Sequence, residues 1–248
     1  GASVITSNSY AVVPFHIGEE RFAAEGQALA ALAGELARRA VEASGKAVRV
    51  AGSLPPLFGS YRPDLFDAAR VTELLTPLVK GLAPHVDLWL AETQSSIVEA
   101  RAIHAGLPKD GKPFWLSFTL KDEDTDEVPR LRSGEPVAEA AAVAAELGIE
   151  VLLFNCSQPE VIGAAIDAAR ETFQRLGVKI HIGAYANAFP PQPKEATAND
   201  GLDPLREDLD PPGYLQWAVD WKARGASHLG GCCGIGPEHI AVLAQKLA

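Results

Sequence analysis

Short apolar runs alternate with longer amphipathic stretches along the whole chain, which predicts a repeated succession of strand and helix. The short runs are almost continuously apolar, as expected for parallel strands that are buried on both faces. Seven of them are predicted as strands: Ser3–Thr6, Ala47–Ala51, Val86–Ala91, Phe114–Thr119, Val151–Asn155, Lys179–Ala184 and Ser227–Gly230.

The stretches between these runs repeat their apolar residues with helical spacing. Several begin near a proline and end before a glycine, as helices commonly do. Seven stretches are predicted as helices: Glu20–Ala43, Ala69–Leu82, Ile97–Ala105, Pro136–Leu147, Pro159–Leu176, Pro212–Arg224 and Pro237–Leu247.

Repeated strand–helix units predict an α/β fold with a parallel sheet and helices outside it. Seven units are one short of the eight that close a (β/α)8 TIM barrel. A doubly wound sheet is disfavoured, because no G-x-G-x-x-G motif follows the first predicted strand. We expect a single barrel domain over residues 1–248, with the first strand of the barrel absent from this sequence. The lack of any methionine, even at position 1, fits an incomplete N-terminus.

Composition narrows the choice of partners. The net charge of −10 disfavours nucleic acid and anionic membranes, because both would be repelled. No run approaches the roughly 18 apolar residues of a membrane span, and no signal peptide is recognisable. Three cysteines are too few for a disulfide framework, which favours a reducing, cytoplasmic setting. We expect small-molecule substrates and make no prediction of the oligomeric state.

All three cysteines follow predicted strands, at the end of a barrel where catalytic residues gather. Cys156 follows the fifth strand, and Cys232 and Cys233 follow the last. Adjacent side chains point to opposite sides of a regular strand, so the pair is expected on the glycine-rich turn after it.

Three thiolates with one open position are a sensible ligand set for catalytic zinc. Spacing alone leaves other interpretations open. Cys156 could be a small buried apolar residue, and the Cys232–Cys233 pair could be a vicinal disulfide or a redox pair without the usual C-x-x-C spacing.

Four further residues at the same strand ends are candidates for substrate contacts. Glu92 suits an ammonium group or a catalytic base, although a structural carboxylate is equally compatible. Asn8 and Ser9 suit a substrate carboxylate or a helix cap. Asn155 is placed to hydrogen-bond beside the metal.

The connection from Asn187 to Gly213 is much longer than the others, proline-rich first and acidic afterwards. Connections of this length are usually functional or disordered. A lid over the strand ends and a solvated surface loop are both compatible with it.

Several motifs resemble those of the homocysteine S-methyltransferase family. Gly230-Gly231-Cys232-Cys233-Gly234 resembles its C-terminal metal motif, and Asn155-Cys156-Ser157 resembles its upstream metal motif. Glu92-Thr93 with Glu99-Ala100, and Thr6-Ser7-Asn8-Ser9-Tyr10, are similar to two earlier segments. The order and spacing also match, so the resemblance covers essentially the whole chain.

The resemblance implies a (β/α)8 barrel with zinc held by the three cysteines. It implies methyl transfer to the thiol of homocysteine, giving methionine, from a sulfonium donor such as S-methylmethionine or S-adenosylmethionine. It places Glu92 at the amino group of homocysteine, and Asn8 and Ser9 beside its carboxylate. The early Asp-Gly-Gly segment of the family has no match in this sequence.

Two other functions stay open. A metal-free thiol redox protein would use Cys232 and Cys233, and zinc content separates it from a methyltransferase. A catalytically inactive zinc-binding barrel would keep the metal, and homocysteine binding separates it.

Overall fold

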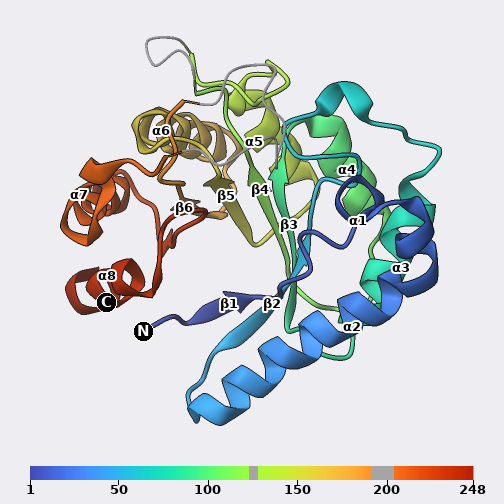
Figure 1. Cartoon of the computed structure of the whole chain (residues 1–248). Helices are drawn as coiled ribbons and strands as arrows, with labels where there is room; N and C mark the ends of the chain where they lie inside the picture. Colours follow the sequence, from blue (N-terminus) through green and yellow to red (C-terminus); the bar gives the residue numbers. More distant parts are fainter. Residues whose placement is uncertain (123–127, 192–203, 248) are drawn as a thin grey trace.

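A computed structural model describes residues 1–122, 128–191 and 204–247. Its centre is a parallel sheet whose strands lie side by side in chain order. Figure 1 shows this sheet curling, with helices on its outer face. The strands are β1 (Val4–Thr6), β2 (Arg49–Leu54), β3 (Leu88–Gln94), β4 (Phe114–Phe118), β5 (Val151–Asn155), β6 (His181–Tyr185) and β7 (His228–Leu229).

In the described part of the chain, at least one helix follows every strand. Parallel neighbours require such crossovers. The helices are α1 (Pro14–Ile17), α2 (Glu19–Ser44), α3 (Val71–Leu82), α4 (Ile97–Gly106), α5 (Val137–Glu146), α6 (Pro159–Leu176), α7 (Pro211–Ala223) and α8 (Pro237–Leu247), with 3-10 turns η1 (Pro63–Leu65) and η2 (Glu207–Leu209). Among the described residues, no helix is both long and apolar enough to cross a membrane.

The sheet is open between its two edge strands, β1 and β7, in the part of the chain that is described. The two ends of the chain nevertheless meet, because a side chain at Gly1 would collide with Ala244 of α8. Figure 1 shows the two termini close together. The prediction of an α/β fold with a parallel sheet is therefore confirmed. Within the described residues the sheet is a curled half-barrel of seven strands rather than a closed ring of eight.

Alternation along the strands sorts side chains between the lumen and the helices. In β3, Leu88 and Leu90 belong to a small inner cluster, whereas Trp89 and Ala91 pack under the helices. The inner cluster also contains Ala51, Trp115, Val151 and Leu153. Because Glu92 continues the inward series of β3, the strand itself directs this carboxyl into the lumen.

Most predicted elements are confirmed within a few residues, and β5, α6 and α8 have the predicted bounds. Two strands run three residues further than predicted, since β2 continues to Leu54 instead of Ala51 and β3 to Gln94 instead of Ala91. Polar residues at these ends favour a turn in the sequence pattern, but here they are buried among hydrogen-bond partners. Glu92 thus lies within β3 rather than after it.

The long connection after β6 is described only at its two ends. Residues 192–203 lie outside the described residues, and the prediction of a lid falls largely on them. At the far end, Arg206 donates hydrogen bonds to Glu160 at 2.6 and 3.0 Å and to Gln158 at 3.0 Å. This end of the connection is thereby fixed to the first turn of α6.

A buried carboxyl lies in the first turn of α4. Glu99 is only 3% exposed, and its Oε2 accepts hydrogen bonds from the Ser95 backbone N–H at 2.9 Å and the Ser96 hydroxyl at 2.8 Å. Burial raises the pKa of Glu99 from 4.5 to about 7, against the opposing effect of these hydrogen bonds. The folded protein therefore binds this proton more tightly than the unfolded chain does.

We predict that Glu99→Gln weakens the pH dependence of stability. A raised carboxyl pKa contributes stability that is present below pH 4.5 and lost as the pH rises through about 7. Glutamine imitates the protonated form, so the variant should gain up to about 3 kcal/mol relative to wild type between pH 4.5 and pH 8. Urea unfolding at several pH values measures this difference. If the free energy of unfolding depends on pH in the same way in the two proteins, the raised pKa of Glu99 is contradicted.

Candidate metal centre

Three cysteine sulfurs meet at the carboxyl ends of β5 and β7. The Sγ atoms of Cys156, Cys232 and Cys233 all lie within 4.8 Å of one another, and those of Cys232 and Cys233 are 3.9 Å apart. Cys156 is buried, Cys232 is partly exposed and Cys233 is exposed. The structure thus brings together the three thiols that the sequence places on one rim.

Backbone geometry brings these thiols to the same side. Cys156 has a φ of +51°, a left-handed conformation that few side-chain-bearing residues adopt, and it turns the chain sharply out of β5. Its N–H donates to the carbonyl of Tyr185 at 3.3 Å, and the N–H of Cys232 donates to the carbonyl of Ala186 at 2.9 Å. The end of β6 and the residue after it therefore hold both cysteine segments in place.

The turn that carries the cysteine pair depends on one glycine in particular. Gly234 has a φ of +78°, and a Cβ there would lie 2.9 Å from Cβ of Ala188. Ala188 in turn donates its N–H to the carbonyl of Cys233 at 2.8 Å. This close approach explains why the glycine follows the second cysteine directly.

The donor set and its spacing fit a tetrahedral thiophilic metal. Zinc–sulfur bonds of about 2.3 Å place two ligand sulfurs about 3.8 Å apart in a tetrahedron. The 3.9 Å between Cys232 and Cys233 agrees with that distance, and Cys156 lies within 4.8 Å of both sulfurs. Three thiolates leave the fourth position of such an ion for another ligand.

The three neighbouring thiols have very different pKa values, because they hydrogen-bond to one another. Hydrogen bonds from Cys156 and Cys232 lower the pKa of Cys233 to about 3. Hydrogen bonds with Cys156 and Cys233, together with burial, raise the pKa of Cys232. The pKa of Cys156 rises to about 12, because its contact with Cys233 and its burial outweigh the opposite effect of Cys232. A cation bound among them would favour the thiolate form of all three.

Glu92 supplies a buried carboxyl on the lumen side of β3. One oxygen accepts a short hydrogen bond from the Ser53 hydroxyl, and the other accepts one from the Tyr185 hydroxyl at 3.4 Å. The side chain is 8% exposed, and burial raises its pKa. A cationic group beside it would restore the charged form, so Glu92 is suited to bind an ammonium ion.

Asn155 ties the end of β5 to the end of β3. Its Oδ1 accepts from the Thr93 backbone N–H at 3.0 Å and from the Ser117 hydroxyl at 2.6 Å, and its Nδ2 donates to the Thr93 hydroxyl at 2.8 Å. Thr93 has a φ of +58°, next to an irregularity in the pairing of β3 with β4. The amide therefore holds the bent strand end between Glu92 and Cys156.

Asn8 and Ser9 lie at the carboxyl end of β1, as predicted, but outside the lining of the cavity described next. Asn8 is exposed. Ser9 is buried, and its hydroxyl donates to the carbonyl of Ser53 at 2.8 Å. Their role beside a substrate carboxylate stays a prediction.

A cavity of about 1750 Å³ adjoins the cysteines and extends between the edge strands. Glu92, Tyr185 and all three cysteines line it, and so do the aromatic residues Tyr10, Tyr61 and Phe189. It can hold small organic molecules in contact with the thiols. The sequence pattern did not single out Tyr61, because this residue lies in the irregular segment after β2 rather than at a strand end.

Comparison with known proteins points to one family. The sequence model of the family described as homocysteine S-methyltransferase matches residues 1–247. S-methylmethionine–homocysteine S-methyltransferase BHMT2 of Pongo abelii is 26% identical over 98% of this chain and 66% of its own length. Homocysteine S-methyltransferase 3 of Arabidopsis thaliana is 30% identical over 65% of this chain and 44% of its own length. The chain thus spans about two thirds or less of these relatives.

A solved structure shows the same architecture. The oxidized form of the homocysteine methyltransferase MmuM from Escherichia coli is 25% identical in sequence and superposes with a TM-score of 0.72. The similarity covers 99% of this chain and 80% of that chain.

We predict that the reduced protein binds about one zinc ion per chain, and that replacing Cys156, Cys232 or Cys233 by serine removes tight binding. Loss of one of three thiolates leaves too few strong ligands for the ion. Titration against a chromophoric chelator measures the affinity. Glu92→Gln, which changes the same cavity without removing a sulfur, is the matched control and should bind zinc like wild type. Equal affinity in wild type and the serine variants would rule out this site.

Proposed function

Because the chain belongs to the homocysteine S-methyltransferase family, we propose that it transfers a methyl group from a sulfonium compound to the thiol of homocysteine, giving methionine. The observation that carries the proposal is the cluster of three thiols on the wall of a cavity that also contains a buried carboxyl. We also propose that residues 1–248 form a single catalytic domain.

Cys156, Cys232 and Cys233 would hold zinc, for which sulfur ligands are selective. When bound, zinc supplies a Lewis acid that lowers the pKa of a thiol at its open position, so that the thiol is nucleophilic near neutral pH. The three cysteine thiolates give the site a net negative charge, which keeps that sulfur rich in electrons.

Glu92 would bind the amino group of homocysteine. Its two oxygens are held by Ser53 and Tyr185, so the carboxylate is oriented before the substrate arrives. Asn155 fixes the strand end that follows Glu92 through its bonds to Thr93. Asn8 and Ser9, at the end of β1, stay the proposed neighbours of the homocysteine carboxylate.

Methyl transfer requires the donor sulfonium and the homocysteine sulfur in line within the cavity. The new carbon–sulfur bond forms as the old one breaks, and the electron pair of the broken bond leaves on the donor as a neutral thioether. Charge is lost in this step, so an environment that excludes water favours it. Tyr10 and Phe189 line the cavity, and aromatic rings attract a cation such as a sulfonium ion.

The proposed donor is S-methylmethionine or S-adenosylmethionine. The relative from Pongo abelii is named for the first of these compounds, which supports S-methylmethionine as the first donor to test.

We predict that the zinc-loaded protein forms methionine from homocysteine and S-methylmethionine, with the product identified by mass spectrometry. The Cys232→Ser protein should form none, because it lacks a metal ligand. Glu92→Gln should retain zinc but raise the KM for homocysteine by roughly 10- to 100-fold, since a charge-assisted hydrogen bond contributes about 1.5–3 kcal/mol.

Glu99→Gln is the matched control, because Glu99 is also a buried carboxyl but lies outside the cavity lining. Its KM for homocysteine should equal that of wild type. Methionine formation by a zinc-free Cys232→Ser protein would disprove the mechanism, and an unchanged KM in Glu92→Gln would remove Glu92 from the substrate site.

A further inference from the structure

Tyr61 makes a direct contact with one of the three thiols. Its hydroxyl lies 2.9 Å from Sγ of Cys156 and 3.3 Å from the carbonyl oxygen of the same residue. Building on the proposed metal site, we propose that Tyr61 is a positioning residue for Cys156, whose hydrogen bond orients this sulfur and lowers its electron donation to the metal.

The contact joins two distant segments that both adopt uncommon backbone conformations. Tyr61 has a φ of +65° and Cys156 a φ of +51°. Left-handed conformations are costly for residues with side chains and persist where the surroundings fix them. Here the strained turn at Tyr61 directs the phenol at the strained turn at Cys156.

A buried cation, the guanidinium group of Arg132, lies over the ring of Tyr61. The guanidinium carbon of Arg132 is 5.1 Å from the centre of the Tyr61 ring. Arg132 pairs with Asp122 at 3.3 Å, and the two side chains are only 4% and 1% exposed. A positive charge over the ring attracts its electrons, holds the ring in place and makes the phenol O–H a stronger donor.

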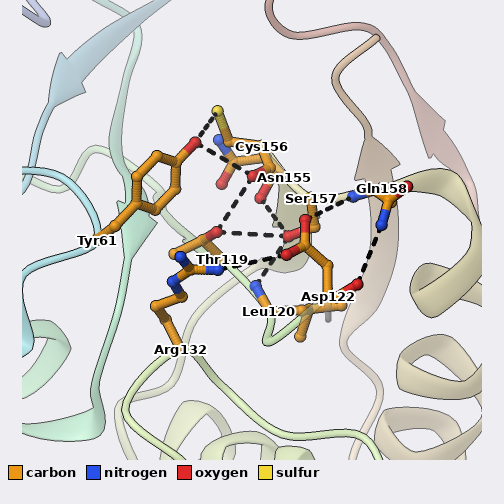
Figure 2. Close-up of polar contacts among 9 residues, drawn as sticks. All are labelled: Tyr61, Thr119, Leu120, Asp122, Arg132, Asn155, Cys156, Ser157 and Gln158. Carbon is orange, nitrogen blue, oxygen red and sulfur yellow. Dashed lines mark hydrogen bonds and ion pairs between the residues drawn. The ribbon is translucent and has the colours of Figure 1, made fainter. Parts of the chain in front are cut away.

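The same ion pair is linked to the segment of Cys156, as Figure 2 shows. Asp122 accepts from the Gln158 backbone N–H at 3.3 Å, and its carbonyl accepts from the Gln158 side chain at 3.0 Å. Thr119 donates its hydroxyl to the carbonyl of Cys156 at 3.3 Å. The segment after β4 therefore holds both the phenol and the backbone that carries the sulfur.

A hydrogen bond to a thiolate withdraws electron density from sulfur, as any charge-assisted donor does. Sγ of Cys156 would then give less charge to the metal than a free thiolate, which leaves the metal a stronger acid toward its fourth ligand. Tyr61 does not touch the reacting atoms in this scheme and acts through Cys156.

The test uses cobalt(II) in place of zinc, because its sulfur-to-metal charge-transfer absorption reports the electron density of the ligands. Tyr61→Phe keeps the ring and removes only the hydroxyl. The variant should bind about one cobalt per chain, and its absorption should shift to longer wavelength because the unbonded thiolate donates more readily. Arg132→Lys, which keeps the charge but not the planar group over the ring, should give a smaller shift in the same direction.

Tyr10→Phe is the matched control, since it removes a hydroxyl from the same cavity that bonds Ser60 at 2.5 Å. Its absorption should match that of wild type. An unshifted band in Tyr61→Phe, or an equal shift in Tyr10→Phe, would overturn the role of Tyr61 even if wild type transfers methyl groups. If the band shifts in Tyr61→Phe but the wild-type protein does not transfer methyl groups, the proposed function is refuted and the role of Tyr61 stands.

Discussion

The curvature of the parallel sheet is the constraint on which the site depends. Cys156 and Cys232 are 76 positions apart, and they meet only because β5 and β7 end at the same rim of a curled sheet. The inner cluster of apolar side chains, which includes Trp115 and Leu153, packs on the concave side of this sheet and lines the cavity there. A flat sheet would move the thiols apart. The geometry of the thiol cluster therefore depends on the curvature of the sheet.

Polar side chains at the rim then stabilise a backbone that is strained in several places. Tyr61, Thr93 and Cys156 all have positive φ values without being glycine. Each takes part in a hydrogen bond between segments distant in the sequence. The Thr93 backbone N–H donates to the Asn155 side chain, and the Tyr61 hydroxyl donates to Sγ of Cys156. Strain of this kind concentrates where a protein holds functional groups in fixed positions. The distribution of strain therefore marks the same region as the thiol cluster does.

Much of this arrangement could be predicted from the sequence. Apolar periodicity gave the strands and helices because burial on both faces leaves a clear pattern, and the ends of parallel strands predicted where Cys156 and Cys232 would meet. The ends of β2 and β3 were predicted too early, since Ser53 and Glu92 are buried polar residues that pattern alone assigns to turns. The contact of Tyr61 with Cys156 could not be predicted, because it joins an irregular segment to a strand end through tertiary geometry alone.

The proposed chemistry requires that three cysteines hold a metal whose remaining position accepts the substrate thiol. X-ray absorption at the zinc edge tests it most directly, because this method counts sulfur neighbours. We expect three sulfur atoms at about 2.3 Å in the zinc-loaded protein and four after homocysteine is added. A sulfur count below three, or a count that homocysteine leaves unchanged, would contradict it.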